Sequence, residues 1–240
     1  MGMTYLTGDT HGNFTRIEAF CHQMETKRSD TMIILGDAGF NYYLGKKDIR
    51  AKEYASRFPI TLFCIHGNHE ARPQTIPSYQ EGEYYGGKVL YEEDFPNLLF
   101  AIDGETYEFD DYQCVVIGGA YSVDKYYRLS KGWRWWPDEQ PDEEIKRKVE
   151  AKLDMMSNRI DIVLSHTCPL KYEPKEAFLP SLDQSTVDKS TEIWLGEIEA
   201  RLDYRKWYCG HYHTRKSVEK VQFMFEDFDV ISVKTLKPQI

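Results

Sequence analysis

The stretch Gly8-Asp9-Thr10-His11-Gly12 follows an apolar, strand-like run at residues 3–7, and four similar clusters follow such runs later in the chain. These clusters are Gly36-Asp37, Gly67-Asn68-His69-Glu70, Ser165-His166 and Gly210-His211-Tyr212-His213. If the runs are strands of one sheet, the carboxylate, imidazole and amide groups at their ends converge on one point. Such a group of oxygen and nitrogen ligands would hold two divalent cations.

Strand-like and helix-like patterns alternate in the first third of the chain. We expect strands at residues 3–7, 31–35 and 60–65, and helices at residues 13–27 and 46–57. The strand runs are nearly continuous in Ile, Leu, Met, Phe and Val, which is typical of strands covered on both faces. This alternation predicts an α/β fold with a substantially parallel sheet.

The middle of the chain changes character. Short runs separated by acidic or glycine-bearing turns predict an antiparallel meander at residues 98–102, 106–109 and 112–117. Residues 84–95 are acidic and glycine-bearing, and we expect a surface excursion there. Later elements are expected as helices at 141–157 and 186–202, strands at 160–164 and 206–209, and closing strands at 217–221, 222–225 and 228–233. No repeat or linker divides the chain, so residues 1–240 are expected to form one domain.

Composition limits the partners and the location. The 240 residues carry a formal net charge of −9, which argues against broad electrostatic binding to nucleic acid or to an anionic membrane. A nucleotide substrate is still compatible, because bound metals supply local positive charge. No apolar run is long enough to cross a membrane, and no signal region precedes the first strand. Together with five scattered cysteines, these features predict a cytoplasmic protein with reduced thiols.

In their order, the five clusters resemble the motifs of the calcineurin-like metallophosphoesterase superfamily. Those motifs are Asp-x-His, Gly-Asp, Gly-Asn-His, a lone His and Gly-His-x-His, and all five occur between Asp9 and His213. The resemblance covers nearly the whole chain and implies a four-layer α-β-β-α sandwich of two mixed sheets. It also implies two divalent metal ions. Mixed nitrogen and oxygen ligation without thiolate suits Mn, Fe, Zn, Co or Ni.

The resemblance implies a role for each matching residue. By this resemblance a first metal would be held by Asp9, His11 and His213, and a second by Asn68, His166 and His211. The carboxylate of Asp37 would bridge the two. His69 would stay free of metal and act as a general acid at the leaving group, an effect typically worth about 10²–10⁴-fold. Attack on phosphorus would come from a hydroxide shared by the two ions.

These roles predict a metal-dependent phosphoric ester hydrolase. A distant alternative is a non-catalytic scaffold on the same fold, but every expected ligand is present. The expected partner is a phosphate-ester substrate. We expect no binding to membranes, we infer no obligate protein partner, and we expect nucleic acid to bind only as a substrate.

One motif departs from the protein-phosphatase version, which reads Gly-Asp-x-x-Asp-Arg. Phe40 stands in place of the aspartate that supports the acid histidine, and Asn41 in place of the arginine that clamps phosphate. Losing a bidentate guanidinium disfavours a dianionic monoester. We therefore favour phosphodiesters of nucleotide or nucleic-acid type. The alternative is a phosphomonoesterase such as a serine/threonine phosphoprotein phosphatase, because residues 67–70 keep that version of their motif.

Two features are candidates for substrate binding. Arg72 is either a replacement phosphate clamp or a solvated loop arginine. Residues 121–136 carry four basic residues against one acidic residue, with aromatics between them, inside an acidic protein. A surface of this kind can stack a base and hold a phosphate. We interpret residues 121–140 as a cap or recognition excursion, with candidate contacts at Lys125, Arg128, Trp133 and Arg134; the alternative is a packed excursion whose tryptophans bury against the core.

Overall fold

The computed structural model describes residues 2–178, 180 and 182–232, which form two mixed sheets. The seven-stranded sheet has the order β13 (Phe228–Ile231), β1 (Thr4–Thr7), β2 (Thr31–Ile34), β3 (Thr61–Cys64), β6 (Leu98–Ala101), β5 (Gly87–Glu92) and β4 (Tyr79–Tyr84). The six-stranded sheet has the order β11 (Lys216–Val218), β12 (Val221–Phe223), β10 (Lys206–Cys209), β9 (Ile162–Ser165), β8 (Tyr112–Ile117) and β7 (Thr106–Phe109).

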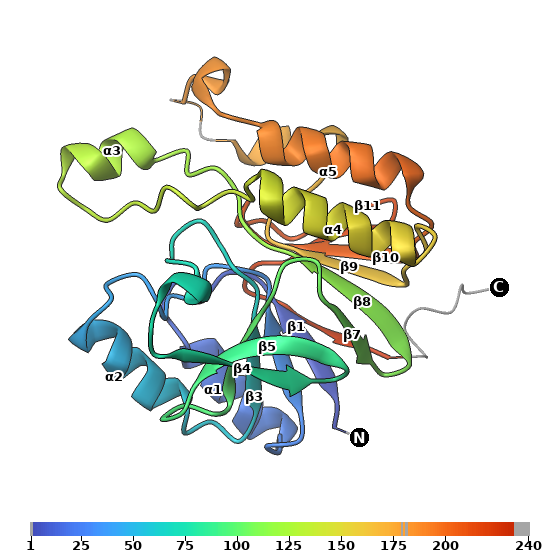
Figure 1. Ribbon diagram of the computed structural model, residues 1–240. Coiled ribbons are helices and arrows are strands. Elements are labelled where there is room, and N and C mark those ends of the chain that lie inside the picture. The colour runs from blue at the N-terminus through green and yellow to red at the C-terminus, as the bar shows by residue number, and fades with distance from the viewer. Residues whose placement is uncertain (1, 179, 181, 233–240) are drawn as a thin grey trace.

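Helices cover the outer face of each sheet (Figure 1). Helices α1 (Thr15–Met24) and α2 (Lys46–Ala55) lie against the seven-stranded sheet, and α4 (Glu143–Met155) and α5 (Ser190–Arg201) lie against the six-stranded sheet. The predicted four-layer α-β-β-α sandwich is confirmed. The shorter helices are α3 (Lys125–Ser130), η1 (Pro73–Thr75), η2 (Leu170–Tyr172), η3 (Lys175–Ala177) and η4 (Gln184–Thr186).

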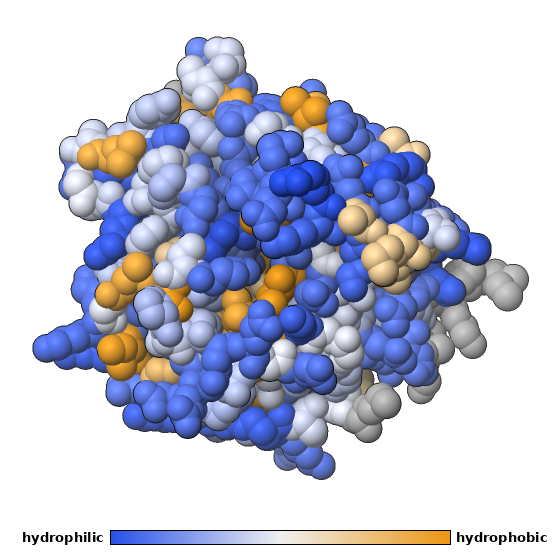
Figure 2. Space-filling view, in the orientation of Figure 1, coloured by the Kyte–Doolittle hydropathy of each residue, from blue (hydrophilic) through white to orange (hydrophobic). Residues whose placement is uncertain are grey.

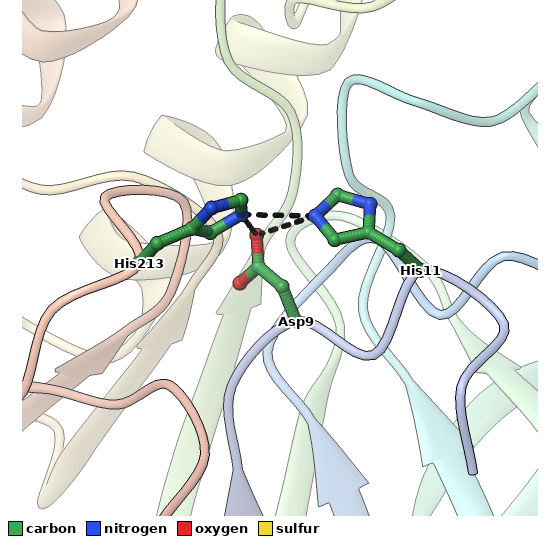
Figure 3. Close-up of side chains that lie close together, drawn as sticks. All are labelled: Asp9, His11 and His213. Carbon is green, nitrogen blue, oxygen red and sulfur yellow. Dashed lines mark hydrogen bonds and ion pairs between the residues drawn. The ribbon is translucent and has the colours of Figure 1, made fainter. Parts of the chain in front are cut away.

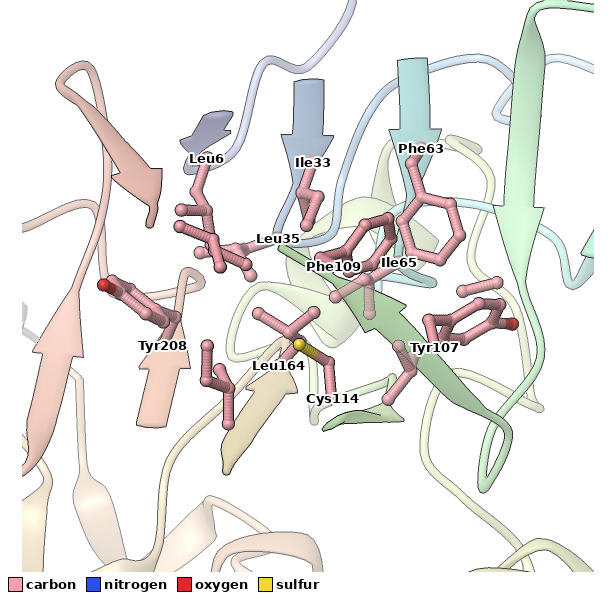
Figure 4. Close-up of a cluster of buried hydrophobic side chains, with 14 of the residues drawn as sticks. Leu6, Ile33, Leu35, Phe63, Ile65, Tyr107, Phe109, Cys114, Leu164 and Tyr208 are labelled. Carbon is pink, nitrogen blue, oxygen red and sulfur yellow. The ribbon is translucent and has the colours of Figure 1, made fainter. Parts of the chain in front are cut away.

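Strands β1, β2, β3, β6 and β9 are buried on both faces, and successive side chains enter different cores. Leu6, Ile33 and Leu164 point between the two sheets, where Figure 4 shows them packed with aromatic rings of β7. Their neighbours in sequence face the helices: Met32 packs in the core under α1 and α2, and Val163 in the core under α4 and α5. Full burial of one such side chain contributes about 1.5–3 kcal/mol. This two-sided burial explains the nearly continuous apolar runs.

Helix α4 illustrates how the sequence sets an element's start. We expected a helix from residue 141, and it begins at Glu143 because Asp142 is its N-cap. The Asp142 Oδ1 atom accepts a hydrogen bond of 2.8 Å from the Ile145 backbone N–H. This bond satisfies one of the four N–H groups that a helix start leaves unpaired. Val149 and Leu153 then face the six-stranded sheet.

The expected surface excursion at residues 84–95 is wrong, because this region belongs to the sheet. Strands β4 and β5 form an antiparallel hairpin at the edge of the seven-stranded sheet, and Val89 is buried. The turn is Tyr85-Gly86, with φ of 47° and 81°, the positive values of a type I′ hairpin turn. Outward-facing acids such as Glu81 and Glu83 hid the alternating pattern of the strands.

The predicted meander is also wrong in part, because it spans two sheets. Strand β6 pairs in parallel with β3 in the seven-stranded sheet, whereas β7 and β8 form an antiparallel pair in the six-stranded sheet. The chain crosses between the sheets at Asp103-Gly104, where Gly104 has a φ of 81°. Closing strands exist near the predicted positions, but residue 233 of the last one lies outside the described residues.

Residues 121–140 leave the sandwich after β8 and return at α4. They carry α3, which projects from the body of the molecule (Figure 1). The side chain of Trp133 is 54% exposed, so the alternative of tryptophans buried against the core is wrong for this residue. The five cysteines are buried free thiols. Among the described residues, no helix is long and apolar enough to cross a membrane.

Candidate functional site

The five predicted clusters meet at one place. Strands β1, β2 and β3 run parallel and carry three clusters at their carboxyl ends, and the parallel strands β9 and β10 carry the other two. We expected one sheet, but the clusters come from both sheets. The carboxyl ends of the two sheets face the same space, so the convergence does not require a common sheet.

One group of ligands contains Asp9, His11 and His213 (Figure 3). The Asp9 Oδ2 atom lies 3.3 Å from His213 Nε2 and 3.8 Å from His11 Nε2. The two imidazole nitrogens are 2.9 Å apart. Asp9 Oδ2 is buried and has no hydrogen-bond partner, which is costly for a carboxylate oxygen. A cation among these three atoms would satisfy them, so this set fits the predicted first metal.

A second group contains Asn68, His166 and His211. The Leu35 carbonyl oxygen can only accept, so His166 donates to it from Nδ1 at 2.8 Å. In the neutral ring Nε2 then carries a lone pair, and it faces Asn68 Oδ1 at 2.8 Å. His211 Nδ1 lies 3.0 Å from the same oxygen. A histidine that donates one nitrogen to a carbonyl and offers the other to a shared space is typical of metal ligation, so this set fits the second metal.

Asp37 lies between the two groups. Its Oδ2 atom is 3.6 Å from His166 Nε2 and 4.0 Å from His11 Nδ1. Its Oδ1 atom accepts a hydrogen bond of 2.8 Å from the His69 backbone N–H. Asp37 is also common to two of the clusters whose atoms are close enough to hold an ion. This position fits a carboxylate that bridges two cations.

The protonation states of Asp37 and His211 suit metal binding. Burial acts to raise the pKa of Asp37, but the imidazoles of His166, His69 and His11 outweigh it and hold that pKa well below the usual range. Burial, reinforced by His166, lowers the pKa of His211 to about 3. The carboxylate is therefore ionised and His211 is neutral at neutral pH, which are the forms that bind metal.

The backbone at the site explains the glycines of the motifs. A Cβ atom on Gly36 would lie 1.9 Å from His166 Nδ1, and one on Gly67 would lie 2.0 Å from Asp37 Oδ1. Any side chain at these positions would displace a ligand. Four of the predicted ligands have a positive φ, namely His11, Asp37, His211 and His213. Non-glycine residues adopt this conformation uncommonly, and it concentrates at functional sites.

His69 lies beside the ligands, with its side chain 30% exposed. Burial lowers its pKa, and Asp37 and Asp124 act in the opposite direction. Its Nε2 atom is 3.9 Å from Asp124 Oδ1, which is buried and has no hydrogen-bond partner. Asp124 was not among the predicted site residues.

Phe40, in place of the family's aspartate, is buried and stacks on Phe14 at 4.7 Å. The carboxylate that lies within 4 Å of the His69 imidazole is therefore that of Asp124, in the excursion after β8, and not one at position 40.

Arg72 is buried rather than solvated. Its Nη1 atom pairs with Asp103 Oδ2 at 2.5 Å, and its Nε donates to the Asp138 carbonyl oxygen at 2.8 Å. Arg128 is also buried: its Nη1 atom lies 3.3 Å from Ser122 Oγ and 3.8 Å from Asp124 Oδ1. The Lys125 ammonium lies 3.9 Å from the centre of the Trp135 ring. These three predicted substrate contacts line neither of the two cavities at the site.

Two cavities of similar size open beside the ligands, and both include His11 and His69 in their walls. The first, about 610 Å³, is the aromatic–basic cavity, lined also by Gly39, Tyr42, Tyr43, Lys47, Gly132, Trp133 and Arg134. The second, about 600 Å³, is the acidic cavity, whose carboxylates are Asp37, Asp124, Glu173, Asp188 and Glu192. The predicted candidates Trp133 and Arg134 therefore lie next to the ligands. Figure 2 shows further exposed apolar residues around the α3 excursion.

The sequence model of the calcineurin-like phosphoesterases matches residues 4–231. The chain belongs to this family. The protein is accordingly a metal-dependent phosphoester hydrolase, and its Asp and His clusters are candidate metal sites. No curated protein matches the chain.

Similar solved structures include TT1561 of Thermus thermophilus, with 10% identity over 95% of this chain and 97% of that chain and a TM-score of 0.48. Another is the phosphopantetheinyl hydrolase PptH from Mycobacterium tuberculosis, with 15% identity over 99% and 93% of the two chains and a TM-score of 0.42. Because these scores are below 0.5, the family assignment rests on the sequence model.

Proposed function

We propose that this protein hydrolyses phosphodiesters at a pair of divalent metal ions. One ion would be held by Asp9, His11 and His213, the other by Asn68, His166 and His211, with Asp37 shared between them. The buried oxygen of Asp9, which has no hydrogen-bond partner, and the facing lone pairs of Asn68 and His166 support this assignment. The donor set suits Mn, Fe, Zn, Co or Ni.

Metal ions bound there would polarise the phosphoryl group and lower the pKa of a water molecule. The protein's own residues supply the remaining chemistry. His69 lies at the junction of the two cavities, where its protonated imidazole would donate to the departing oxygen. The Asp124 carboxylate, 3.9 Å away, would stabilise the protonated form of that imidazole electrostatically. The Ser122 hydroxyl accepts a hydrogen bond of 2.9 Å from Asn68 Nδ2, which turns the Asn68 carbonyl oxygen toward the histidines.

The preference for diesters rests on one observation: two cavities of about 600 Å³ meet at His11 and His69. A phosphodiester carries two organic substituents, and each cavity would take one of them. A monoester would leave one cavity without a ligand. The predicted monoester clamp, Arg72, is already paired with Asp103, which further favours a diester.

The test is a side-by-side assay of bis-p-nitrophenyl phosphate and p-nitrophenyl phosphate after reconstitution with Mn or Ni. We expect a higher kcat/KM on the diester. A clear monoester preference would contradict the proposal and favour a phosphomonoesterase. Metal content is measured on the same samples, and absence of both metal and turnover would instead support the scaffold alternative.

A further inference from the structure

The two cavities beside the metal centre differ sharply in charge. Of the residues that the structure describes, Lys47 and Arg134 but no carboxylate line the aromatic–basic cavity. Five carboxylates but no described lysine or arginine line the acidic cavity. A substrate spanning both therefore has one anionic end and one neutral or cationic end. The protein as a whole carries a net charge of −9. A cavity whose charged lining residues, leaving histidine aside, are Lys47 and Arg134 departs from this balance and requires an explanation.

The aromatic–basic cavity is built from two segments that are distant in sequence. One wall is the loop after β2, with Tyr42 and Tyr43, together with Lys47 in the first turn of α2, and the other is the segment after α3, with Trp133 and Arg134. The Tyr42 hydroxyl lies 3.5 Å from the Arg134 carbonyl oxygen, where the two walls meet. The cavity therefore lies between the sandwich and the excursion and needs both for its walls.

The first wall is held in place by α2. The buried carboxylate of Asp48 accepts hydrogen bonds from the backbone N–H groups of Tyr43, at 2.9 Å, and Leu44, at 2.6 Å. Leu44 has a φ of 47°, a strained conformation that these bonds stabilise. Tyr43 is nevertheless 43% exposed, so the hydrogen bonds fix the backbone that carries the ring while part of the ring stays in water. A preorganised, partly exposed ring is a suitable platform for stacking.

The cations of this cavity form no close ion pair among the described residues, although Arg134 lies near enough to Asp48 to act on its carboxylate. Within the described ranges, neither Lys47 nor Arg134 forms an ion pair with a carboxylate within 4 Å. The Lys47 ammonium lies 4.3 Å from the centre of the Tyr43 ring. Aromatic faces together with such cations match a heterocyclic base linked to phosphate, because every base offers a π face and phosphate pairs with guanidinium.

We propose that the aromatic–basic cavity binds a nucleotide unit of the substrate, with its base against Trp133 and Tyr43 and a further phosphate near Lys47 and Arg134. This inference rests on the proposed phosphodiesterase function and narrows it. The substrate is then an asymmetric diester. Its nucleotide lies on the aromatic–basic side of the phosphorus, and a neutral or cationic substituent lies in the acidic cavity.

The experiment compares two substrates with the same leaving group, thymidine 5′-(p-nitrophenyl phosphate) and methyl p-nitrophenyl phosphate, on the metal-reconstituted protein. We expect kcat/KM to be at least about 10-fold higher for the nucleoside ester, the usual scale of base stacking on aromatic residues. Hydrolysis of neither substrate would overturn the proposed function. Hydrolysis of both with a ratio near one would overturn only the nucleotide inference.

Substitutions at the cavity then test the stacking. Trp133→Ala should reduce the ratio of the two kcat/KM values about 10-fold. Tyr126→Ala is the matched control, because Tyr126 is an aromatic of the same excursion, is 69% exposed and does not line the cavity. The control should keep the wild-type ratio. An unchanged ratio in Trp133→Ala would contradict the assignment.

The further phosphate is tested with thymidine 3′,5′-bisphosphate as a competitive inhibitor of methyl p-nitrophenyl phosphate hydrolysis. Arg134→Gln should raise its inhibition constant about 10-fold relative to that of thymidine 5′-monophosphate. Lys131→Gln removes an exposed cation of the same excursion that does not line the cavity, and it should change neither constant. Equal effects of the two substitutions would show a general charge effect and refute a defined phosphate site.

Discussion

The metal centre and the α3 excursion are built in opposite ways. The centre's Asp9, Asp37, Asn68 and His166 are at most 2% exposed, Asp37 has a positive φ, and Gly36 and Gly67 leave no room for a side chain beside these ligands. Trp133, at the excursion's end, is instead 54% exposed. Catalytic geometry tolerates little error, so it requires an interlocked scaffold, whereas substrate recognition can vary on a segment that the scaffold only carries.

The largest effect should follow a change at the centre of the interlocked set. Asp37→Asn removes the carboxylate that both metals would share, and we expect loss of both metals and a fall in kcat greater than about 100-fold, beyond the effect typical of outer-shell partners. Metal content and kcat are measured together. Asp94→Asn, an exposed site at the opposite end of the strands, is the control. Normal turnover by Asp37→Asn would contradict the bridging role.

Gly67→Ala tests whether close packing alone maintains the centre. The new methyl group would lie 2.0 Å from Asp37 Oδ1, so we expect weaker metal binding and lower activity without any change of ligand. Gly196→Ala is the matched control, because the nearest atom to its methyl group would be 4.0 Å away and α5 gains a better helix former. Metal titration checks both variants. Equal affinity in the two would mean that the site relaxes more easily than its packing indicates.

His69→Ala should preserve metal content and lower kcat. For substrates with alkoxide leaving groups we expect a loss of about 10²–10⁴-fold, the usual contribution of a general acid. Nitrophenolate departs without a proton, so the loss on nitrophenyl esters should be smaller. Steady-state kinetics on both classes provide the measurement, with the exposed His22→Ala as control. Equal losses on the two classes would argue against proton donation by His69.

Asp124→Asn tests the contact between the excursion's Asp124 and His69, the proposed general acid. Because Asp124 would act through His69, we expect kcat on substrates with alkoxide leaving groups to fall about 10-fold, while KM stays nearly unchanged. This fall is at the lower end of the effects seen when a residue that supports a functional side chain is removed. Asp138→Asn is the control on the same excursion, since Arg72 contacts its backbone carbonyl. A change in KM alone would assign Asp124 to substrate binding in the acidic cavity.

The smallest effect should come from the surface of the excursion. Tyr126→Ala removes a ring that is 69% exposed, and we expect the free energy of unfolding to change by less than about 0.5 kcal/mol. Leu164→Ala, between the sheets, should cost about 2–5 kcal/mol. Urea denaturation measures both. Similar losses would mean that the excursion is part of the folding core.

Which structural features could be predicted from the sequence depends on how far apart in the chain the interacting residues lie. Local signals predicted the strand ends, the helix start to within two residues of Glu143 and the order of the ligand clusters, because a glycine turn or an apolar run acts within a few residues. The hairpin at residues 79–92 was missed, since its outward acids masked the alternation and Tyr85-Gly86 is an unusual turn. The two sheets were also not separable along residues 98–117, where short strands look alike whichever sheet they join.

The sequence by itself determined the chemistry: carboxylate, imidazole and amide ligands in a family's order, with a histidine beside them and no aspartate or arginine at positions 40 and 41. Only the tertiary structure decided what stands near that histidine and what surrounds the substrate. Asp124 approaches His69 from a distant part of the chain, Arg72 turns inward to Asp103, and Lys47 and Arg134 come to line one cavity. Such contacts depend on how whole layers pack, and no local pattern of residues encodes them.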